Sequence, residues 1–101
     1  MAQLVSSNGT KVTLESAGIR ETFIFNKEHI PYIRNNQDRI YFDSTNSSWR
    51  YMTKKGTFTT LPKHMYIRFK RGGTYEELTK KVRFANGDTR DLRTKNLTIK
   101  R

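Results

Sequence analysis

The sequence predicts a small α+β fold, with β-hairpins near the N-terminus, in a single domain over residues 1–101. Three observations lead to this prediction. A length of 101 residues suits one domain and is short for two. Turn residues separate short alternating segments, which are typical of strands, while other segments carry helix-start signals. The chain has no repeats, low-complexity runs or linkers that would divide it.

The first predicted element is a β-hairpin over residues 3–14. Asn8 and Gly9 are a preferred pair for a tight type I′ turn, in which both central residues have positive φ. Residues 15–21 are then expected to form a connection. The apolar face of the hairpin would consist of Leu4, Val12 and Leu14.

A short strand is predicted over residues 22–25, and a single helical turn over 27–30 with Asn26 as its cap. Pro31 argues against a longer helix there, because proline has no N–H and favours an extended conformation in the residue before it. Residues 32–35 are therefore expected to be extended or irregular.

In the middle of the chain, the sequence pattern predicts a strand over residues 39–43 and then a second hairpin. The strands of this hairpin are expected at 49–53 and 57–61, because turn residues separate them and apolar residues alternate along them.

A helix is predicted from residue 61 to residue 70, since Pro62 suits the first turn of a helix. A strand stays the alternative there, because Met65, Ile67 and Phe69 alternate along the chain. The remaining elements are expected in this order: a short helix over 74–81, a strand over 82–84, a turn over 86–88, and a final short helix or strand from Asp91.

The strongest functional signal is the distribution of charge. The chain has 20 Lys and Arg against 9 Asp and Glu, which gives a formal net charge of +11. Residues 1–45 hold five of each and are neutral, whereas residues 46–101 hold fifteen basic and four acidic residues. A strongly basic region predicts a polyanionic partner, and nucleic acid is the first hypothesis. The candidate nucleic-acid-binding residues are Lys54, Lys55, Lys63, Arg68, Lys70, Arg71, Lys80, Lys81, Arg83, Arg90, Arg93 and Lys95.

Aromatic residues are interleaved with these cations. Such side chains can stack on unpaired bases. The chain is only 34% hydrophobic, however, so its core needs the large area that each aromatic side chain buries. Trp49, Phe58 and Phe69 are therefore expected in the core.

Residue content excludes several classes of protein. Without cysteine there is no disulfide framework and no thiolate zinc site, and two histidines are too few for a histidine metal cage. We therefore expect no metal and no cofactor. No run of 18 apolar residues could span a membrane, and the first residues do not resemble a signal peptide. A reducing, cytoplasmic setting is expected.

The segment over residues 82–97 carries a recognisable motif. It reads Val-Arg-Phe-Ala-Asn-Gly-Asp-Thr-Arg-Asp-Leu-Arg-Thr-Lys-Asn-Leu. It resembles, without a gap, the end of the motif of phage HNH homing endonucleases, Val-Asp-His-x-Asn-Gly-Asp-x-x-Asp-Asn-Arg-x-x-Asn-Leu. The resemblance implies a C-terminal ββα-metal unit, a phage origin and contact with double-stranded DNA. The matching positions are Val82, Asn86, Gly87, Asp88, Asp91, Arg93, Asn96 and Leu97.

Two departures from the motif affect its chemistry. Arg83 and Phe84 stand where the family has its metal-binding Asp and its general-base His. Arginine has no lone pair for a metal, and phenylalanine cannot accept a proton, so no catalytic residue is assigned. The resemblance then implies that Asn86 and Gly87 form the turn of the ββα unit and that Asp91 caps its helix. A catalytically inactive HNH relative that binds double-stranded DNA is the favoured hypothesis.

Two other functions stay open. The chain could be a small viral interaction protein that binds and inhibits a host enzyme through its basic surface. It could also be an active metal-dependent nuclease with rearranged ligands, in which His64 would act as a displaced general base. The other histidine, His29, lies in a mostly polar stretch and is expected at the surface.

Overall fold

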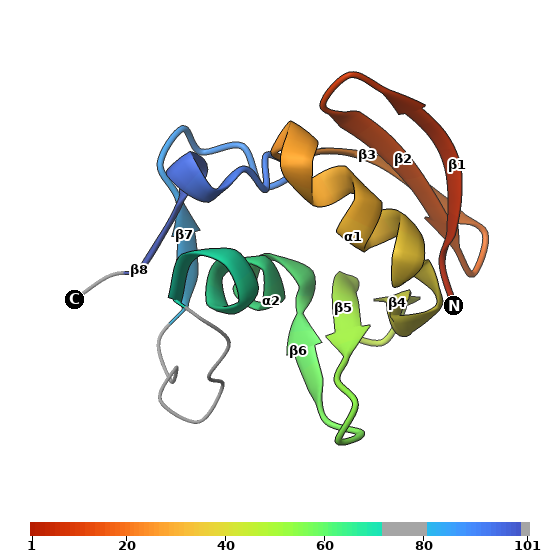
Figure 1. Cartoon of the computed structure of the whole chain (residues 1–101). Helices are drawn as coiled ribbons and strands as arrows, with labels where there is room; N and C mark the ends of the chain where they lie inside the picture. Colours follow the sequence, from red (N-terminus) through yellow and green to blue (C-terminus); the bar gives the residue numbers. More distant parts are fainter. Residues whose placement is uncertain (72–80, 100–101) are drawn as a thin grey trace.

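The structure is a computed structural model that describes residues 1–71 and 81–99, with the side chain of Arg71 excepted. In those residues, eight strands form three small antiparallel sheets, and two α-helices pack beside them (Figure 1). The α+β prediction is thus confirmed. The Cα radius of gyration is 12.7 Å, close to the roughly 13 Å expected for a domain of this length. No helix in the described ranges is long and apolar enough to cross a membrane.

The first sheet lies at the N-terminal end and has the strand order β1-β2-β3. Val12 and Leu14 of the central strand are fully buried, and Leu4 packs against the same cluster opposite Leu14, as predicted. The strands are β1 (Gln3–Asn8), β2 (Lys11–Ser16) and β3 (Ile19–Ile24).

The turns of this sheet differ from the prediction. Asn8 still belongs to β1, so the first turn begins at Gly9, which alone in that turn has a positive φ, of 64°. The two positive φ values of a type I′ turn occur instead at Ala17 (53°) and Gly18 (79°). The prediction of a connection over residues 15–21 is therefore wrong, because β2 and β3 stay paired on both sides of this tight turn.

A helical segment follows β3 and comprises η1 (Lys27–His29), α1 (Ile30–Asn35) and η2 (Gln37–Arg39). The prediction of an extended stretch after Pro31 is wrong. Pro31 lies in the first turn of α1, where a backbone N–H would have no intrahelical partner in any case. Asn26 makes no side-chain cap; its backbone carbonyl accepts the His29 N–H at 2.9 Å.

The second sheet has the order β4-β5-β6, with β4 (Ile40–Asp43), β5 (Ser48–Met52) and β6 (Phe58–Thr60). It confirms the predicted strand and second hairpin. α2 (Leu61–Tyr66) follows β6 directly and continues as a π-helical turn, η3 (Ile67–Arg71). The helix prediction is confirmed over the strand alternative, because Leu61, His64 and Met65 are buried together at helical spacing. α2 contacts both the second and the third sheet (Figure 1).

The third sheet pairs β7 (Val82–Phe84) with β8 (Leu97–Ile99), and η4 (Thr94–Asn96) precedes β8. The chain from Asp91 to residue 99 thus contains a 3₁₀ turn and a strand, and no α-helix. Backbone pairing with β3 is the reason. Ile24 donates its N–H to the Arg90 carbonyl at 2.9 Å and accepts the Leu92 N–H at 2.7 Å, which holds this stretch extended.

The short helix predicted over residues 74–81 lies outside the described residues, apart from Lys81.

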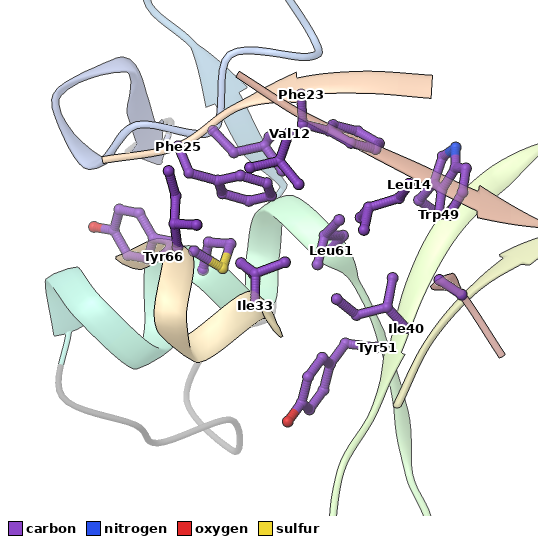
Figure 2. Packing of buried hydrophobic residues seen from close by; sticks show 14 of the residues in the cluster. Val12, Leu14, Phe23, Phe25, Ile33, Ile40, Trp49, Tyr51, Leu61 and Tyr66 are labelled. Carbon is purple, nitrogen blue, oxygen red and sulfur yellow. The ribbon is translucent and has the colours of Figure 1, made fainter. Parts of the chain in front are cut away.

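One hydrophobic cluster joins the sheets and helices (Figure 2). Of the three aromatic residues expected there, Trp49 is buried and Phe69 packs partly against the cluster. Phe58 is 57% exposed, because its neighbour Thr59 occupies the buried face of β6 and adjacent strand residues face opposite sides. Fully buried members of the cluster include Phe25, Ile33, Ile40, Leu61, Met65, Leu92 and Leu97.

Candidate nucleic-acid interface

The motif residues near the C-terminus form one hydrogen-bonded cluster around Asp91. This residue is 1% exposed, and its carboxylate accepts hydrogen bonds from Arg93 Nε at 2.8 Å, Arg93 Nη2 at 2.5 Å and Asn86 Nδ2 at 2.9 Å. Asn96 donates from Nδ2 to the Asp91 carbonyl at 2.9 Å and accepts the Asn86 N–H at 2.8 Å. Four motif positions therefore stabilise the loop between β7 and β8.

This cluster keeps the Asp91 carboxylate charged. Hydrogen bonding from Arg93 lowers the pKa of Asp91 to about 2, against the opposing effect of burial. The same loop is tied to the first half of the chain, because the Thr94 N–H donates to Asn26 Oδ1 at 2.8 Å. Asp91 thus acts as an ion-pair partner in a loop rather than as a helix cap, and the Asn26 side chain anchors this loop.

The two positions that depart from the endonuclease motif lie on β7. Arg83 is exposed, whereas Phe84 is partly buried against the core, as expected for neighbours on a strand. Among the described residues, no group of three or more His, Cys, Asp or Glu side chains could hold a metal ion. At these two positions the chain thus presents an exposed guanidinium and a partly buried phenyl ring.

The candidate cations lie in three places in the fold: the turn between β5 and β6, the segment α2–η3, and the chain from β7 to β8. Lys80 and the side chain of Arg71 lie outside the described part. The others are Lys54 and Lys55 in the turn, Lys63, Arg68 and Lys70 on α2 and η3, and Lys81, Arg83, Arg90, Arg93 and Lys95 in the last segment.

Three of these cations form ion pairs or hydrogen bonds with groups that the structure describes. Arg90 Nε forms an ion pair with Glu21 of β3, and Arg93 pairs with the buried carboxylate described above. Lys70 Nζ donates to two backbone carbonyls of η4 and β8, at 3.1 and 2.7 Å. Arg90 and Lys70 thus join the C-terminal segment to the rest of the fold, and Arg93 stabilises the segment internally, so all three are less available to a partner.

Five of the candidate cations remain available at the surface. Each is exposed and forms no ion pair with any residue that the structure describes. Lysine and arginine side chains in this state can neutralise phosphates without first breaking an ion pair to any of those residues. We call them the five unpaired cations: Lys54, Arg68, Lys81, Arg83 and Lys95.

A first pocket, of about 540 Å³, lies beside the C-terminal cations. Its lining is mainly apolar and includes Phe42, Trp49 and Phe84. Lys63, Lys81 and the ion-paired Arg90 also line it. This pocket brings core aromatic residues and three of the candidate cations together.

A second pocket, of about 470 Å³, is lined by residues of α1, the β5–β6 hairpin, α2 and η3, including Lys54. The rings of Tyr51 and His64 stack with centroids 3.5 Å apart. Tyr32 Oη lies 2.7 Å from His64 Nε2, and the Arg68 guanidinium carbon lies 5.2 Å from the Tyr32 ring centroid. Sequence reasoning identified the two cations and counted Tyr51 among the interleaved aromatic residues, but it missed Tyr32, because no sequence spacing links α1 to β5.

Both histidines are buried. The surface position predicted for His29 is wrong: it is 8% exposed and its ring stacks on Phe69 with centroids 3.7 Å apart. This burial lowers the pKa of His29. His64 is 3% exposed, and burial, followed by the positive charge of Arg68, lowers the pKa of His64 to about 4. The His64 imidazole is therefore neutral at pH 7.

Comparison with known protein families, curated proteins and solved structures gives no match for this chain. The function proposed below accordingly rests on the charges, contacts and pockets of the chain itself.

Proposed function

We propose that the chain binds nucleic acid, double-stranded DNA above all, as a catalytically inactive, phage-encoded relative of the HNH endonucleases that acts in the cytoplasm of the host cell. The observation that carries this proposal is the position of the charge. The whole excess of +11 falls within residues 46–101, and the five unpaired cations there are exposed. Contacts between such cations and phosphates release condensed counterions, which drives binding without sequence selectivity.

Arg83 supports binding without cleavage. Its guanidinium stands where the resemblance would place a metal ligand, and a guanidinium can contact a backbone phosphate directly through paired N–H donors. We therefore expect no nicking of plasmid DNA in the presence of Mg²⁺ or Mn²⁺. Metal-dependent nicking that disappears in His64→Ala would support the active nuclease instead.

A second candidate is a protein that binds an acidic surface of a host enzyme. The exposed Phe58 favours it. Its ring meets that of Tyr41 edge-on at 5.7 Å, outside the core, and Lys54 and Lys55 lie in the turn before it. Aromatic side chains are enriched in protein–protein interfaces. A packed interface of this kind loses less affinity with salt than phosphate contacts do.

Fluorescence anisotropy with a labelled duplex distinguishes the two candidate functions, because it measures the affinity for DNA over a series of salt concentrations. Each phosphate contact contributes about −0.9 to the slope of log K against log salt, so five unpaired cations predict a slope of about −3 to −5. Absence of binding at about 50 mM salt, where several phosphate contacts hold, would overturn the proposal.

A further inference from the structure

The pocket beside Tyr32, Tyr51 and His64 is a polar recess at the edge of the core. Its volume of about 470 Å³ falls within the roughly 300–1,000 Å³ typical of small-molecule sites. Figure 2 shows Tyr51 at the margin of the hydrophobic cluster, with its hydroxyl pointing away from the aliphatic side chains. The recess therefore offers polar groups to a ligand, whereas the first pocket offers mainly apolar ones.

A directed chain of hydrogen bonds forms the wall of this pocket. Tyr32 Oη donates to Tyr51 Oη at 3.1 Å, and Tyr51 Oη donates to Asn36 Oδ1 at 3.4 Å. Tyr32 Oη also shares a hydrogen bond of 2.7 Å with His64 Nε2. Asn36 Nδ2 donates in turn to the Tyr32 carbonyl at 2.8 Å. These contacts fix the aromatic rings in place and leave the wall uncharged.

Two cations from different elements add positive charge to this uncharged wall. Lys54 comes from the turn after β5 and Arg68 from η3, and both belong to the unpaired cations. The guanidinium of Arg68 is held over the Tyr32 ring by a cation–π contact. No acidic side chain of the described residues lines the pocket. Its charge is therefore close to +2, with no internal compensation from those residues.

We propose that this pocket binds the phosphate monoester of a nucleotide, at the end of a nucleic-acid strand or as a free mononucleotide. A phosphate monoester carries a charge of about −1.5 to −2 at pH 7, which matches the two cations, whereas each phosphate within a strand carries one negative charge. Tyr51 and His64 are buried, so the part-exposed Tyr32 ring and the Arg68 guanidinium plane are the groups of the wall that an unstacked base or sugar would contact. The inference rests on the proposed function and deepens it: internal phosphates of a duplex contact the other exposed cations, and the terminal phosphate enters the recess.

Calorimetric titration with thymidine 5′-monophosphate tests the pocket, with thymidine as the matched probe that lacks the phosphate. The monophosphate should bind at least about tenfold more tightly, because charge-assisted hydrogen bonds contribute most of the affinity. Lys54→Gln and Arg68→Gln should each weaken its binding by roughly tenfold. Lys11→Gln removes the same charge from an exposed position on β2 and should change the affinity less than about twofold. Equal affinity for the two probes, or equal losses in all three variants, would overturn the inference.

A competition between 5′-phosphorylated and 5′-hydroxyl duplexes of one sequence identifies the source of the phosphate. A preference of about tenfold for the phosphorylated duplex that is lost in Arg68→Gln would identify the terminal phosphate of a strand as the ligand of the pocket. Monophosphate binding without that preference would identify a free mononucleotide as the ligand. Either result supports the inference that the pocket binds a phosphate monoester. Salt-dependent binding of the 5′-hydroxyl duplex with no response to monophosphate overturns the pocket and leaves the proposed function standing. Monophosphate binding without duplex affinity overturns the proposed function and supports the pocket.

Discussion

The neutral residues 1–45 and the basic residues 46–101 differ in how far acidic residues balance their cations. In the first region, Arg20 of β3 pairs with Glu15 of β2 at 2.6 Å, within one sheet. In the second region, the five unpaired cations face outward. The boundary in charge is nevertheless not a boundary in the fold, because Glu21 of the first region pairs with Arg90 of the second, and β3 pairs with the chain at Asp91.

This difference shows that the charge available to a partner has to be counted residue by residue. Arg90 and Arg93 both belong to the basic region by sequence. Arg90 attaches that region to the first one through Glu21, whereas Arg93 pairs with Asp91 inside the basic region itself. The predictions below therefore separate cations that hold the fold together from cations that are available for binding.

The largest effect on stability is expected at Asp91, whose carboxylate stabilises the loop between β7 and β8. Asp91→Ala should lower the free energy of unfolding by about 3 kcal/mol, because it leaves Arg93 and the Asn86 amide without their buried acceptor. Urea denaturation at pH 7 measures this loss. Asp38→Ala, at an exposed position on η2, is the matched control and should change stability by less than about 0.5 kcal/mol. A loss below about 1 kcal/mol for Asp91→Ala would contradict the structural role of the motif.

The pocket histidine should make stability depend on pH. The pKa of His64 is lowered from 6.5 to about 4 in the folded chain, so the unfolded chain binds the extra proton first. The neutral His64 side chain makes its full contribution to the free energy of unfolding above pH 6.5. The free energy of unfolding should fall by up to about 3 kcal/mol as the pH drops towards 4. The lowered pKa of His29 acts in the same direction, and Asp91 adds a separate loss only below about pH 4.

Urea denaturation at a series of pH values measures the effect, and His64→Gln is the control, since an amide keeps a hydrogen-bond donor but does not titrate. The variant should show a flatter curve between pH 6.5 and 4. A ring-proton titration by NMR that gives His64 an unperturbed pKa would refute the buried, neutral state of this histidine.

Charge reversal compares the two regions directly. Lys54→Glu combined with Arg83→Glu should weaken binding to a duplex by roughly a hundredfold and make the salt slope shallower by about 2, since both residues are exposed, unpaired cations. Lys11→Glu combined with Lys27→Glu, both exposed in the neutral region, should weaken it by less than about threefold. Anisotropy at constant salt measures both. Equal losses would show that the binding surface is not confined to the basic region.

The strands and helix that sequence reasoning found are those with strong local signals. The turn residues at Gly56 and the alternation around it specify the β5–β6 hairpin, and Pro62 marks the start of α2. The same local rules failed at Pro31. The local sequence does not distinguish a proline in the first turn of a helix from a proline that ends one, because the difference depends on the conformation of the residues that follow.

Other features depend on contacts between distant segments and could not be predicted locally. Leu92 is extended because Ile24, far away in sequence, accepts its N–H. The second pocket needs Tyr32 and Tyr51 to meet His64 from three different elements. The type I′ turn at residues 17–18 has an alanine at a position where asparagine, aspartate or glycine would have signalled it.

The smallest effect is expected at the ion pair that joins the two regions. Arg90→Gln removes a cation that Glu21 already neutralises, whereas Arg83→Gln removes an unpaired one. Arg90→Gln should therefore weaken duplex binding by less than about twofold, against about fivefold for Arg83→Gln. Arg90→Gln should instead lower the free energy of unfolding by about 0.5 kcal/mol, the usual contribution of an exposed pair. A double-mutant cycle with Glu21→Gln should show that most of this value is the coupling energy between the two residues.

If the two arginine variants lose equal affinity, Arg90 leaves Glu21 to contact the nucleic acid, and Glu21→Gln should then strengthen binding. If Arg90→Gln changes neither stability nor affinity, the pair with Glu21 does not form in solution, and the basic region is attached to β3 by other contacts, such as the backbone hydrogen bonds of Ile24 and the packing of Phe23 against Trp49.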